Sequence, residues 1–268
     1  MIIDKMMPVS KIELKKIKSL ATKKGRRKRG LFLAEGVRLM EESIRFGFWP
    51  DTVYYAPAML SKRGFQLVRQ FERQHIETKK LSAPELESAS DAEAPQGIVG
   101  LFAIPKMTLS KLYYPHYRKL LLCENISDPG NLGTLVRSAL AFSFDLALVC
   151  GSTAEPFAPK VVRASAGAIF GLPIADVTLN QLEAFLKKVR ILVIASDLHG
   201  DIDFRMSKKK FKSKKILLAV GSEATGLSKR ILDRADLRLR IPHSRAVESL
   251  NAAVAGSILM KEIYDNVH

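Results

Sequence analysis

Three clusters of polar and glycine residues in the second half of the chain hold the side chains that could carry out chemistry. The clusters span residues 125–137, 218–228 and 241–251. Each lies at the end of a short apolar run of the kind that forms a buried parallel strand. Open α/β sheets bind their ligands beyond the carboxyl ends of such strands, so the three clusters are candidates for a binding or catalytic site.

The first cluster opens a predicted helix that carries one arginine on its polar face. We expect Asn131 to cap this helix, with the apolar residues 132, 135, 136, 139 and 140 on its buried face. Arg137 then lies on the opposite face, the same face as Asn131. A guanidinium beside a helix N-terminus suits a phosphate group. An ordinary amphipathic helix with a solvated arginine explains the same pattern equally well.

The second and third clusters each place a few polar residues next to a helix start. Gly221 follows a buried strand and would let a ligand approach the backbone closely, and Glu223 supplies a carboxylate before the next helix. Ser249 and Asn251 fall within the first turns of a predicted helix over residues 247–264. Taken singly, each cluster is also explained by helix capping or a simple turn.

The chain lacks the signatures of several other classes of enzyme. It contains no G-x-G-x-x-G, G-x-x-x-x-G-K-[ST], H-E-x-x-H or G-x-S-x-G motif, and the first absence argues against an NAD-dependent dehydrogenase. No spacing of Cys, His or carboxylates predicts a metal site. The two cysteines, Cys123 and Cys150, lie in apolar runs, and we expect them to be buried small residues in a reducing compartment.

Strands and helices alternate over the first hundred residues, which predicts an α/β domain over residues 1–104. A basic helix is expected at 10–24, with Ser10 as its N-cap and Glu13 completing a capping box. The expected strands are 31–33, 52–55, 76–78 and 97–104, and the expected helices are 35–45, 58–73 and one that starts at Ser82. Two prolines break the pattern after residue 104, and we interpret residues 105–117 as a linker.

The same alternation resumes in the second half and predicts a second α/β domain, residues 118–268, with a mainly parallel sheet. Its expected strands are 120–123, 146–150, 191–195, 216–220 and 237–241. Besides the helix opened by the first cluster, the expected helices are 180–189, 228–234 and 247–264. In the last helix we expect an apolar stripe formed by Val247, Leu250, Val254 and Ile258.

Two basic stretches carry the whole net charge of +16. Residues 1–30 contain eleven Lys and Arg against two acidic residues, and residues 204–215 contain seven against none. Such clusters beside neutral domains are typical of nucleic-acid-binding proteins, although a solvated helix face that binds nothing specific is the alternative. The residues expected to contact the nucleic acid are Lys23, Lys24, Arg26, Arg27, Lys28, Arg29, Lys208, Lys209 and Lys210.

A membrane is not expected as a partner. The basic stretch at 23–29 lacks the interleaved aromatic and leucine residues of an interfacial helix. No apolar run reaches the ~18 residues of a membrane span, and the N-terminus has no signal-peptide core. We therefore expect a cytoplasmic protein.

Taken together, the order and spacing of the three clusters resemble those of a known family. Asn131-Leu-Gly133…Arg137, Gly221-Ser-Glu223…Gly226-Leu-Ser and Ile241-Pro…Ser249-Leu-Asn251 resemble the motifs of the SpoU (TrmH-type) RNA ribose methyltransferases of the SPOUT superfamily. Phe32-Leu-Ala-Glu-Gly36 and Pro95-Gln-Gly97 are similar to the family's N-terminal substrate-binding domain. The chain departs from the family where His243 and Arg245 replace Met and Gly, and where Ala252-Ala253 replaces Val-Ser, beside the methyl-donor pocket.

The resemblance implies the fold, cofactor and partners of the protein. The second domain would be a trefoil-knotted parallel sheet, and the first a ribosomal-protein-like α/β RNA-binding domain. The donor would be S-adenosylmethionine, held by Leu218, Gly221, Ile241, Pro242 and Leu250. The acceptor would be a ribose 2′-hydroxyl of RNA, with 23S ribosomal RNA favoured over tRNA, and the enzyme would work as a homodimer through its C-terminal domain.

The resemblance also assigns catalytic roles. Asn131 and Glu223 would orient Arg137 and the target ribose, while Ser249 and Asn251 would shape the donor pocket. Arg137 would act either as the base or as a clamp that binds phosphate and stabilises the developing oxyanion, since a guanidinium stays protonated in proteins. A non-catalytic RNA-binding protein on the same fold is the rival interpretation.

Overall fold

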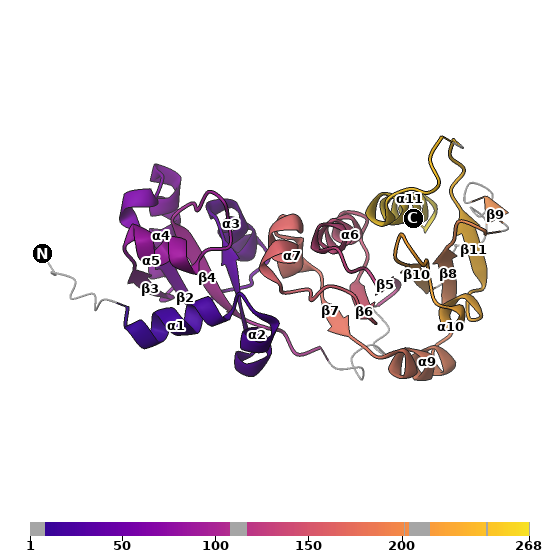
Figure 1. Ribbon diagram of the computed structural model, residues 1–268, viewed down its shortest axis with the longest axis horizontal. Helices are drawn as coiled ribbons and strands as arrows, with labels where there is room; N and C mark the ends of the chain where they lie inside the picture. Colours follow the sequence, from indigo (N-terminus) through magenta and orange to yellow (C-terminus); the bar gives the residue numbers. More distant parts are fainter. Residues whose placement is uncertain (1–8, 108–116, 201, 204–214, 245, 268) are drawn as a thin grey trace, which may run out of the picture. The chain divides into compact units, whose positions relative to one another are not determined.

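The computed structural model describes residues 9–107, 117–200, 202–203, 215–244 and 246–267, and these form two compact units (Figure 1). The first unit contains Met1–Pro105 together with Phe157–Gly171, and the second contains Lys106–Pro156 and Leu172–His268. Most of the predicted linker lies outside the described residues, as do Lys208, Lys209, Lys210 and Arg245.

The first unit is built on a mixed four-stranded sheet of order β1-β4-β2-β3. Its strands are β1 Leu31–Glu35, β2 Thr52–Tyr55, β3 Glu77–Lys80 and β4 Ile98–Ala103. Strand β4 runs antiparallel to both β1 and β2, whereas β2 and β3 are parallel. All four strands overlap the predicted ranges, and β1, β2 and β4 are short, largely apolar or β-branched runs, whereas β3 has the sequence Glu-Thr-Lys-Lys.

Six helical elements from the first hundred residues accompany this sheet: α1 Lys11–Ser19, α2 Lys23–Arg29, α3 Val37–Arg45, the 3-10 helix η1 Pro57–Met59, α4 Lys62–Arg73 and α5 Ala83–Ala89. The single basic helix predicted at 10–24 is wrong, since the chain forms α1 and α2 instead. The hydroxyl of Thr22 accepts a hydrogen bond from the backbone N–H of Gly25 and so starts a new helix.

The predicted cap of α1 is half correct. The Ser10 hydroxyl accepts a hydrogen bond from the Glu13 backbone N–H, as expected of an N-cap. The Glu13 carboxylate does not complete a capping box, because it accepts hydrogen bonds from the Tyr54 hydroxyl and from Nζ of Lys79, both at 2.7 Å. Glu13 therefore ties α1 to strands β2 and β3.

Both faces of the first sheet are buried. On one face, Ile17 and Leu20 pack with Tyr54, Leu86 and Leu101. Aromatic rings cover the other face, where the ring of Phe32 lies 5.4 Å from that of Phe102 between centroids.

Two further phenylalanines of this aromatic layer come from the second half of the chain. The ring centroid of Phe157 lies 4.8 Å from that of Phe32, and that of Phe170 lies 5.1 Å from that of Phe102. Phe157 precedes helix α7, Pro159–Ala164, and Phe170 lies within helix α8, Ala168–Gly171. We predicted neither helix, nor that this segment would leave the domain expected over residues 118–268.

The second unit contains a seven-stranded sheet of order β7-β6-β5-β10-β8-β11-β9. Every strand pair in it is parallel, as predicted for this half. The strands are β5 Lys119–Glu124, β6 Leu146–Cys150, β7 Ile174–Asp176, β8 Leu192–Ser196, β9 Ile202–Asp203, β10 Ile216–Val220 and β11 Leu237–Arg240. Strands β7 and β9 were not predicted.

Helices pack on this sheet in two groups. Leu182 and Phe185 of α9, Leu179–Lys188, and Ile231 of α10, Lys229–Leu232, join a core with Leu122 and Leu217. Helix α11, Ala252–Val267, packs against α6, Pro129–Ala141, and against β10 and β8 (Figure 1). A side chain at Gly256 would collide with Leu135 and Val220, so the helices approach closely there.

Two predicted helix starts in this unit are wrong. Helix α6 begins at Pro129, and its cap is Asp128, whose Oδ1 accepts a hydrogen bond from the Asn131 backbone N–H at 2.7 Å. Helix α11 begins only at Ala252, so Val247 and Leu250 precede it. Val247 and Val254 are exposed, and the buried face contains Ala252, Ala253, Leu259, Met260 and Ile263 instead of the predicted stripe.

The two cysteines agree with the sequence prediction. Cys123 and Cys150 are free and buried, as predicted, and burial raises the pKa of the Cys150 thiol to about 12. None of the helices in the described ranges combines the length and apolar character needed to cross a bilayer. Those ranges also contain no group of three or more His, Cys, Asp and Glu side chains that could hold a metal ion.

Candidate active site

The three sequence clusters meet at the carboxyl edge of the seven-stranded sheet. The loops after β5, β10 and β11 lie at this edge because all three strands run in the same direction. The segment after each strand contributes one polar residue to a shared network: Asn131 from the first turn of α6, and Glu223 and Asn251 from loops. The central strands are fully buried, so this network rests on a rigid support.

The Glu223 carboxylate is the centre of the network. Its Oε1 accepts hydrogen bonds from Nδ2 of Asn131 at 3.0 Å, from Nδ2 of Asn251 at 2.6 Å and from the Ala252 backbone N–H at 3.1 Å. Nδ2 of Asn251 also donates to Oδ1 of Asn131 at 2.9 Å. Three residues separated by up to 120 positions therefore hold one another in place.

The loop that carries Glu223 is a compact turn with little freedom. The Ser222 hydroxyl lies 2.8 Å from that of Thr225 and accepts a hydrogen bond from the Thr225 backbone N–H. A Cβ atom at Gly221 would lie 2.3 Å from the carbonyl carbon of Gly226, so no larger residue fits there. We predicted that Gly221 lets a ligand approach the backbone, and the backbone that approaches it in this structure belongs to the loop itself.

Glu124 anchors the far end of this loop. Its side chain is 1% exposed at the end of β5, and its Oε2 accepts a hydrogen bond from the Ser228 backbone N–H at 2.7 Å. A buried carboxylate bonded to a backbone amide holds its partner segment firmly. The position of Glu223 is thus set from both ends of the turn.

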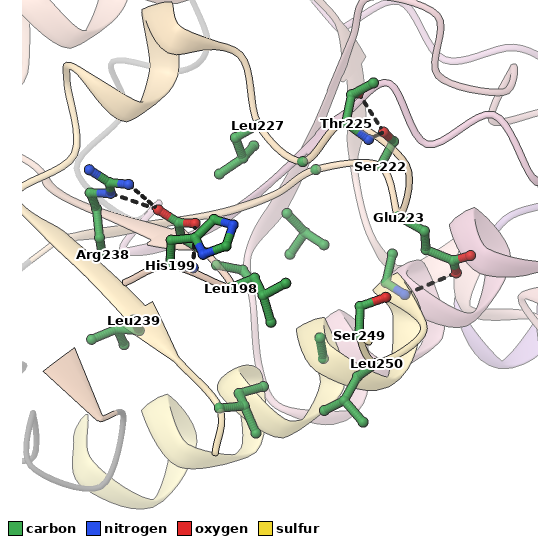
Figure 2. A pocket seen from close by; sticks show the side chains of 18 of the residues that line it. Leu198, His199, Ser222, Glu223, Thr225, Leu227, Arg238, Leu239, Ser249 and Leu250 are labelled. Carbon is green, nitrogen blue, oxygen red and sulfur yellow. Dashed lines mark hydrogen bonds and ion pairs between the residues drawn. The ribbon is translucent and has the colours of Figure 1, made fainter. Parts of the chain in front are cut away.

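A cavity of about 350 Å³ lies directly beside this network (Figure 2). Its volume falls within the ~300–1,000 Å³ of typical ligand sites. Figure 2 shows Glu223, Ser249 and Leu250 on one side of it, and Arg238 and His199 on the other. The lining mixes apolar side chains with hydroxyl, carboxylate and imidazole groups, which suits a ligand with both an apolar and a charged part.

The far side of the cavity is formed by residues that the sequence reasoning missed. Nε of Arg238 donates to Oδ2 of Asp197 at 2.6 Å, and Oδ1 of Asp197 accepts a hydrogen bond from the His199 backbone N–H. Asp197 and His199 follow β8, a predicted strand whose carboxyl end lies at the same edge. That strand end was the signal that could have identified them.

The residues predicted to hold a cofactor are only partly brought together. Gly221, Ile241 and Leu250 line the cavity, together with His243. Leu218 and Pro242 do not line it. Leu218 lies fully buried in the middle of β10, paired with β5 and β8, so it supports the sheet rather than the cavity wall.

Arg137 lies apart from the network that was expected to orient it. It is exposed on α6 and makes no hydrogen bond or ion pair with any described residue, including Asn131 and Glu223. At a rise of about 1.5 Å per residue, it lies roughly 9 Å further along the helix axis than Asn131. No residue in the described part of the chain therefore occupies the guanidinium, and it is available to a ligand.

The basic helix of the first unit separates into exposed and buried residues. Lys23, Lys24, Arg27, Lys28 and Arg29 are exposed on α2. Arg26 is only 3% exposed, and its Nη1 donates to the backbone oxygens of Leu20 at 2.7 Å and Ala21 at 2.9 Å. The prediction that Arg26 contacts nucleic acid is thus wrong, because its guanidinium satisfies carbonyl groups at the end of α1.

A parallel sheet with a cavity and a polar network at its carboxyl edge defines an α/β enzyme of the ligand-binding, open-sheet class. Residues 118–261 match the SpoU rRNA Methylase family, and residues 11–100 match the MRM3-like substrate binding domain. The first match covers more than half of the chain, which therefore belongs to the SpoU rRNA methylase family.

Known relatives match this chain along nearly its full length. The 23S rRNA (guanosine(2553)-2′-O)-methyltransferase RlmP of Bacillus subtilis (strain 168) is 31% identical over 92% of this chain and 94% of its own length. The AdoMet-bound rRNA methyltransferase from Sinorhizobium meliloti has a TM-score of 0.84 at 26% identity, covering 98% of this chain and 97% of that one. The SpoU methyltransferase AviRb from Streptomyces viridochromogenes, in complex with AdoMet, has a TM-score of 0.81 at 25% identity over 96% and 98%.

Proposed function

We propose that this chain transfers a methyl group from S-adenosylmethionine to a ribose 2′-hydroxyl of RNA, and that its substrate is large-subunit ribosomal RNA. The observation that carries the proposal is the hydrogen-bonded junction of Asn131, Glu223 and Asn251 on the wall of a cavity. The name of RlmP and the AdoMet bound to two structural relatives support the reaction and the donor. The match of residues 11–100 to an MRM3-like substrate binding domain favours ribosomal RNA over tRNA.

The cavity suits S-adenosylmethionine in size and chemistry. The imidazole Nε2 of His243 is buried there without a hydrogen-bond partner among the described residues, which leaves it available to a polar ligand. Gly221, Ile241 and Leu250 are the residues that we expect to hold the cofactor. When bound, S-adenosylmethionine would supply a methyl group on a positively charged sulfur, already activated for transfer.

The residues of the network position the acceptor. Glu223 and the two asparagines are pre-organised by their mutual hydrogen bonds, so the ribose would be aligned without reorganisation of the site. Ser249 and Asn251 would shape the path between the donor and the ribose. Arg137 would bind a substrate phosphate and stabilise the oxyanion that develops at the 2′ position, with proton removal by Arg137 as the alternative role.

The remaining expectations concern assembly and RNA contact. We propose that the sheet of the second unit is threaded as a trefoil knot, that residues 105–117 act as a linker, and that the protein works in the cytoplasm as a homodimer through its second unit. The exposed basic residues of α2 would bind the RNA backbone, and so would Lys208, Lys209 and Lys210. Phosphate contacts of this kind position an RNA without specifying its sequence.

Methyl transfer to defined RNAs tests the proposal. The purified protein is incubated with radiolabelled S-adenosylmethionine and either transcribed large-subunit rRNA or transcribed tRNA, and the modified ribose is mapped. We expect label on a single rRNA nucleotide, resistant to alkaline cleavage. Label on tRNA alone would contradict the substrate, and RNA binding without any transfer would identify a non-catalytic RNA-binding protein.

A further inference from the structure

A second cavity of about 490 Å³ lies at the same edge of the sheet. It is lined by residues that follow β5, β6 and β10, including Asn125, Asp128 and Ser152. Both cavities are bordered by the turn at residues 222–225 and by Ala252. Glu223 therefore stands on the wall that the two cavities share, and no ligand-binding role has yet been given to Asn125 or Asp128.

The wall of the second cavity presents an oriented amide. Asn125 has a backbone φ of 58°, in the left-handed region that asparagine tolerates. Its Oδ1 accepts hydrogen bonds from the Ser152 backbone N–H at 2.9 Å and from the Ser152 hydroxyl at 3.1 Å. The Nδ2 group has no partner among the described residues, so its two N–H donors remain available to a ligand.

A carboxylate acceptor lies on the same wall. Oδ1 of Asp128 caps α6 through the Asn131 backbone N–H, while its second oxygen makes no hydrogen bond to a described residue. The cavity thus offers a donor from Asn125 and an acceptor from Asp128. Every nucleobase carries both donors and acceptors on its pairing edge, so an amide and a carboxylate can read an unpaired base.

We propose that the second cavity binds the target nucleoside, with its ribose toward Glu223 and its base against Asn125 and Asp128. The proposal rests on the proposed methyl transfer, which requires a ribose within reach of a donor in the first cavity. The wall shared by the two cavities is where such a ribose would lie. Contacts to base edges specify a nucleic-acid site, so these two residues select the nucleotide, whereas the basic helix α2 only positions the RNA.

Asn125→Gly removes the side-chain amide that we propose contacts the base. It leaves the backbone unstrained, because glycine readily adopts a positive φ. Ser143→Gly is the matched control, since Ser143 also has a positive φ, is exposed and lines neither cavity. We expect Asn125→Gly to lower kcat/KM for RNA about tenfold, through KM, while leaving the affinity for S-adenosylmethionine unchanged. Wild-type kcat/KM in Asn125→Gly would overturn the proposal.

A direct binding measurement separates this proposal from the reaction itself. Adding each of the four nucleoside 5′-monophosphates to isotope-labelled full-length protein should shift the NMR amide signals of Asn125, Ser127 and Ser152, and one base should bind more tightly than the others. Asn125→Gly should weaken that preference. If these signals do not move, the nucleoside site is wrong, even if methyl transfer is observed. If they move and no RNA is methylated, the proposed function fails instead.

Discussion

Nδ2 of Asn251 lies 2.6 Å from Oε1 of Glu223, and Oδ1 of the same asparagine caps α11. Oδ1 of Asn251 accepts hydrogen bonds from the backbone N–H groups of Ala253 at 3.0 Å and Val254 at 3.1 Å. One amide therefore joins the start of the last helix to the carboxylate at the cavity. Its two functions can be separated by substitution.

Replacing Asn251 tests the network apart from the helix cap. Asn251→Asp keeps an oxygen that can cap α11 but places a second carboxylate against Glu223, so we expect methyl transfer to fall about 100-fold with little loss of stability. Asn251→Ala should lose both the cap of α11 and methyl transfer, and it should cost about 1 kcal/mol more in unfolding free energy than Asn251→Asp. Turnover assays and chemical denaturation measure the two effects. Equal turnover in Asn251→Asp and the wild type would contradict the role of the network.

Substitution of Arg137 should abolish methyl transfer without destabilising the fold. Because Arg137 is exposed and makes no hydrogen bond or ion pair with a described residue, Arg137→Ala should change the unfolding free energy by less than about 0.5 kcal/mol. We expect it to bind S-adenosylmethionine normally and to transfer no methyl group. Calorimetric titration and a single-turnover assay test this. Near wild-type turnover would exclude Arg137 from the reaction.

Neighbouring arginines of α2 should give opposite results. Arg26→Ala leaves the carbonyls of Leu20 and Ala21 without their partner, and we expect a loss of about 2 kcal/mol in stability. Arg27 is exposed, so Arg27→Ala should cost less stability than Arg26→Ala and should weaken RNA binding, with the salt dependence of the logarithm of the affinity reduced by about 0.7 to 0.9. Denaturation and filter binding at several salt concentrations distinguish them. A chain truncated before residue 30 is a poorer test, because it also removes the core residues Ile17 and Leu20.

The turn at Gly221 should not tolerate a side chain. Gly221→Ala would place a Cβ atom 2.3 Å from the Gly226 carbonyl carbon and 2.4 Å from the Leu227 nitrogen, so the turn must shift. We expect loss of S-adenosylmethionine binding together with a lower melting temperature. Gly130→Ala is the control, since its nearest neighbour is the Asp128 Oδ1 at 3.0 Å, in the first turn of α6. Normal cofactor affinity in Gly221→Ala would show that the turn is adaptable.

Stability should fall in acid because of Glu13. Burial alone would raise the pKa of this carboxyl, but hydrogen bonds from Lys79 and Tyr54 outweigh it and lower the pKa below its usual value. A group whose pKa is lower in the folded state stabilises the fold above its unfolded pKa, and that contribution disappears as the pH drops through the folded value. Denaturation of the wild type and Glu13→Gln at a series of pH values should show their difference shrinking below about pH 4. A constant difference would contradict this.

All the strands except β7 and β9 could be predicted, as could the meeting of the three loops, because they follow from local patterns. Buried parallel strands are short apolar runs, and their carboxyl ends share one edge of the sheet. Helix starts were less predictable. The apolar spacing of Val247 and Leu250 continues that of α11, but the helix begins where Asn251 caps two backbone amides.

Other features depend on contacts that a sequence does not display. Six basic residues of α2 look alike, and only the position of the last turn of α1 makes Arg26 the buried one. Likewise, nothing in the pattern of residues 157–171 shows that Phe157 and Phe170 pack on Phe32 and Phe102 of the first unit. The strands that precede and follow this segment in the chain belong to the seven-stranded sheet instead. Tertiary contacts of this kind override local propensity.

The excursion of residues 157–171 into the first unit has a consequence for protein engineering and for recombination. The polypeptide crosses between the units three times, after residues 105, 156 and 171. A chimera with a single junction near residue 105 would therefore combine β1 and β4 of one parent with the phenylalanines of the other. Exchanging the first unit between relatives requires transplanting two pieces of chain together. The two units therefore cannot be recombined as two consecutive gene segments.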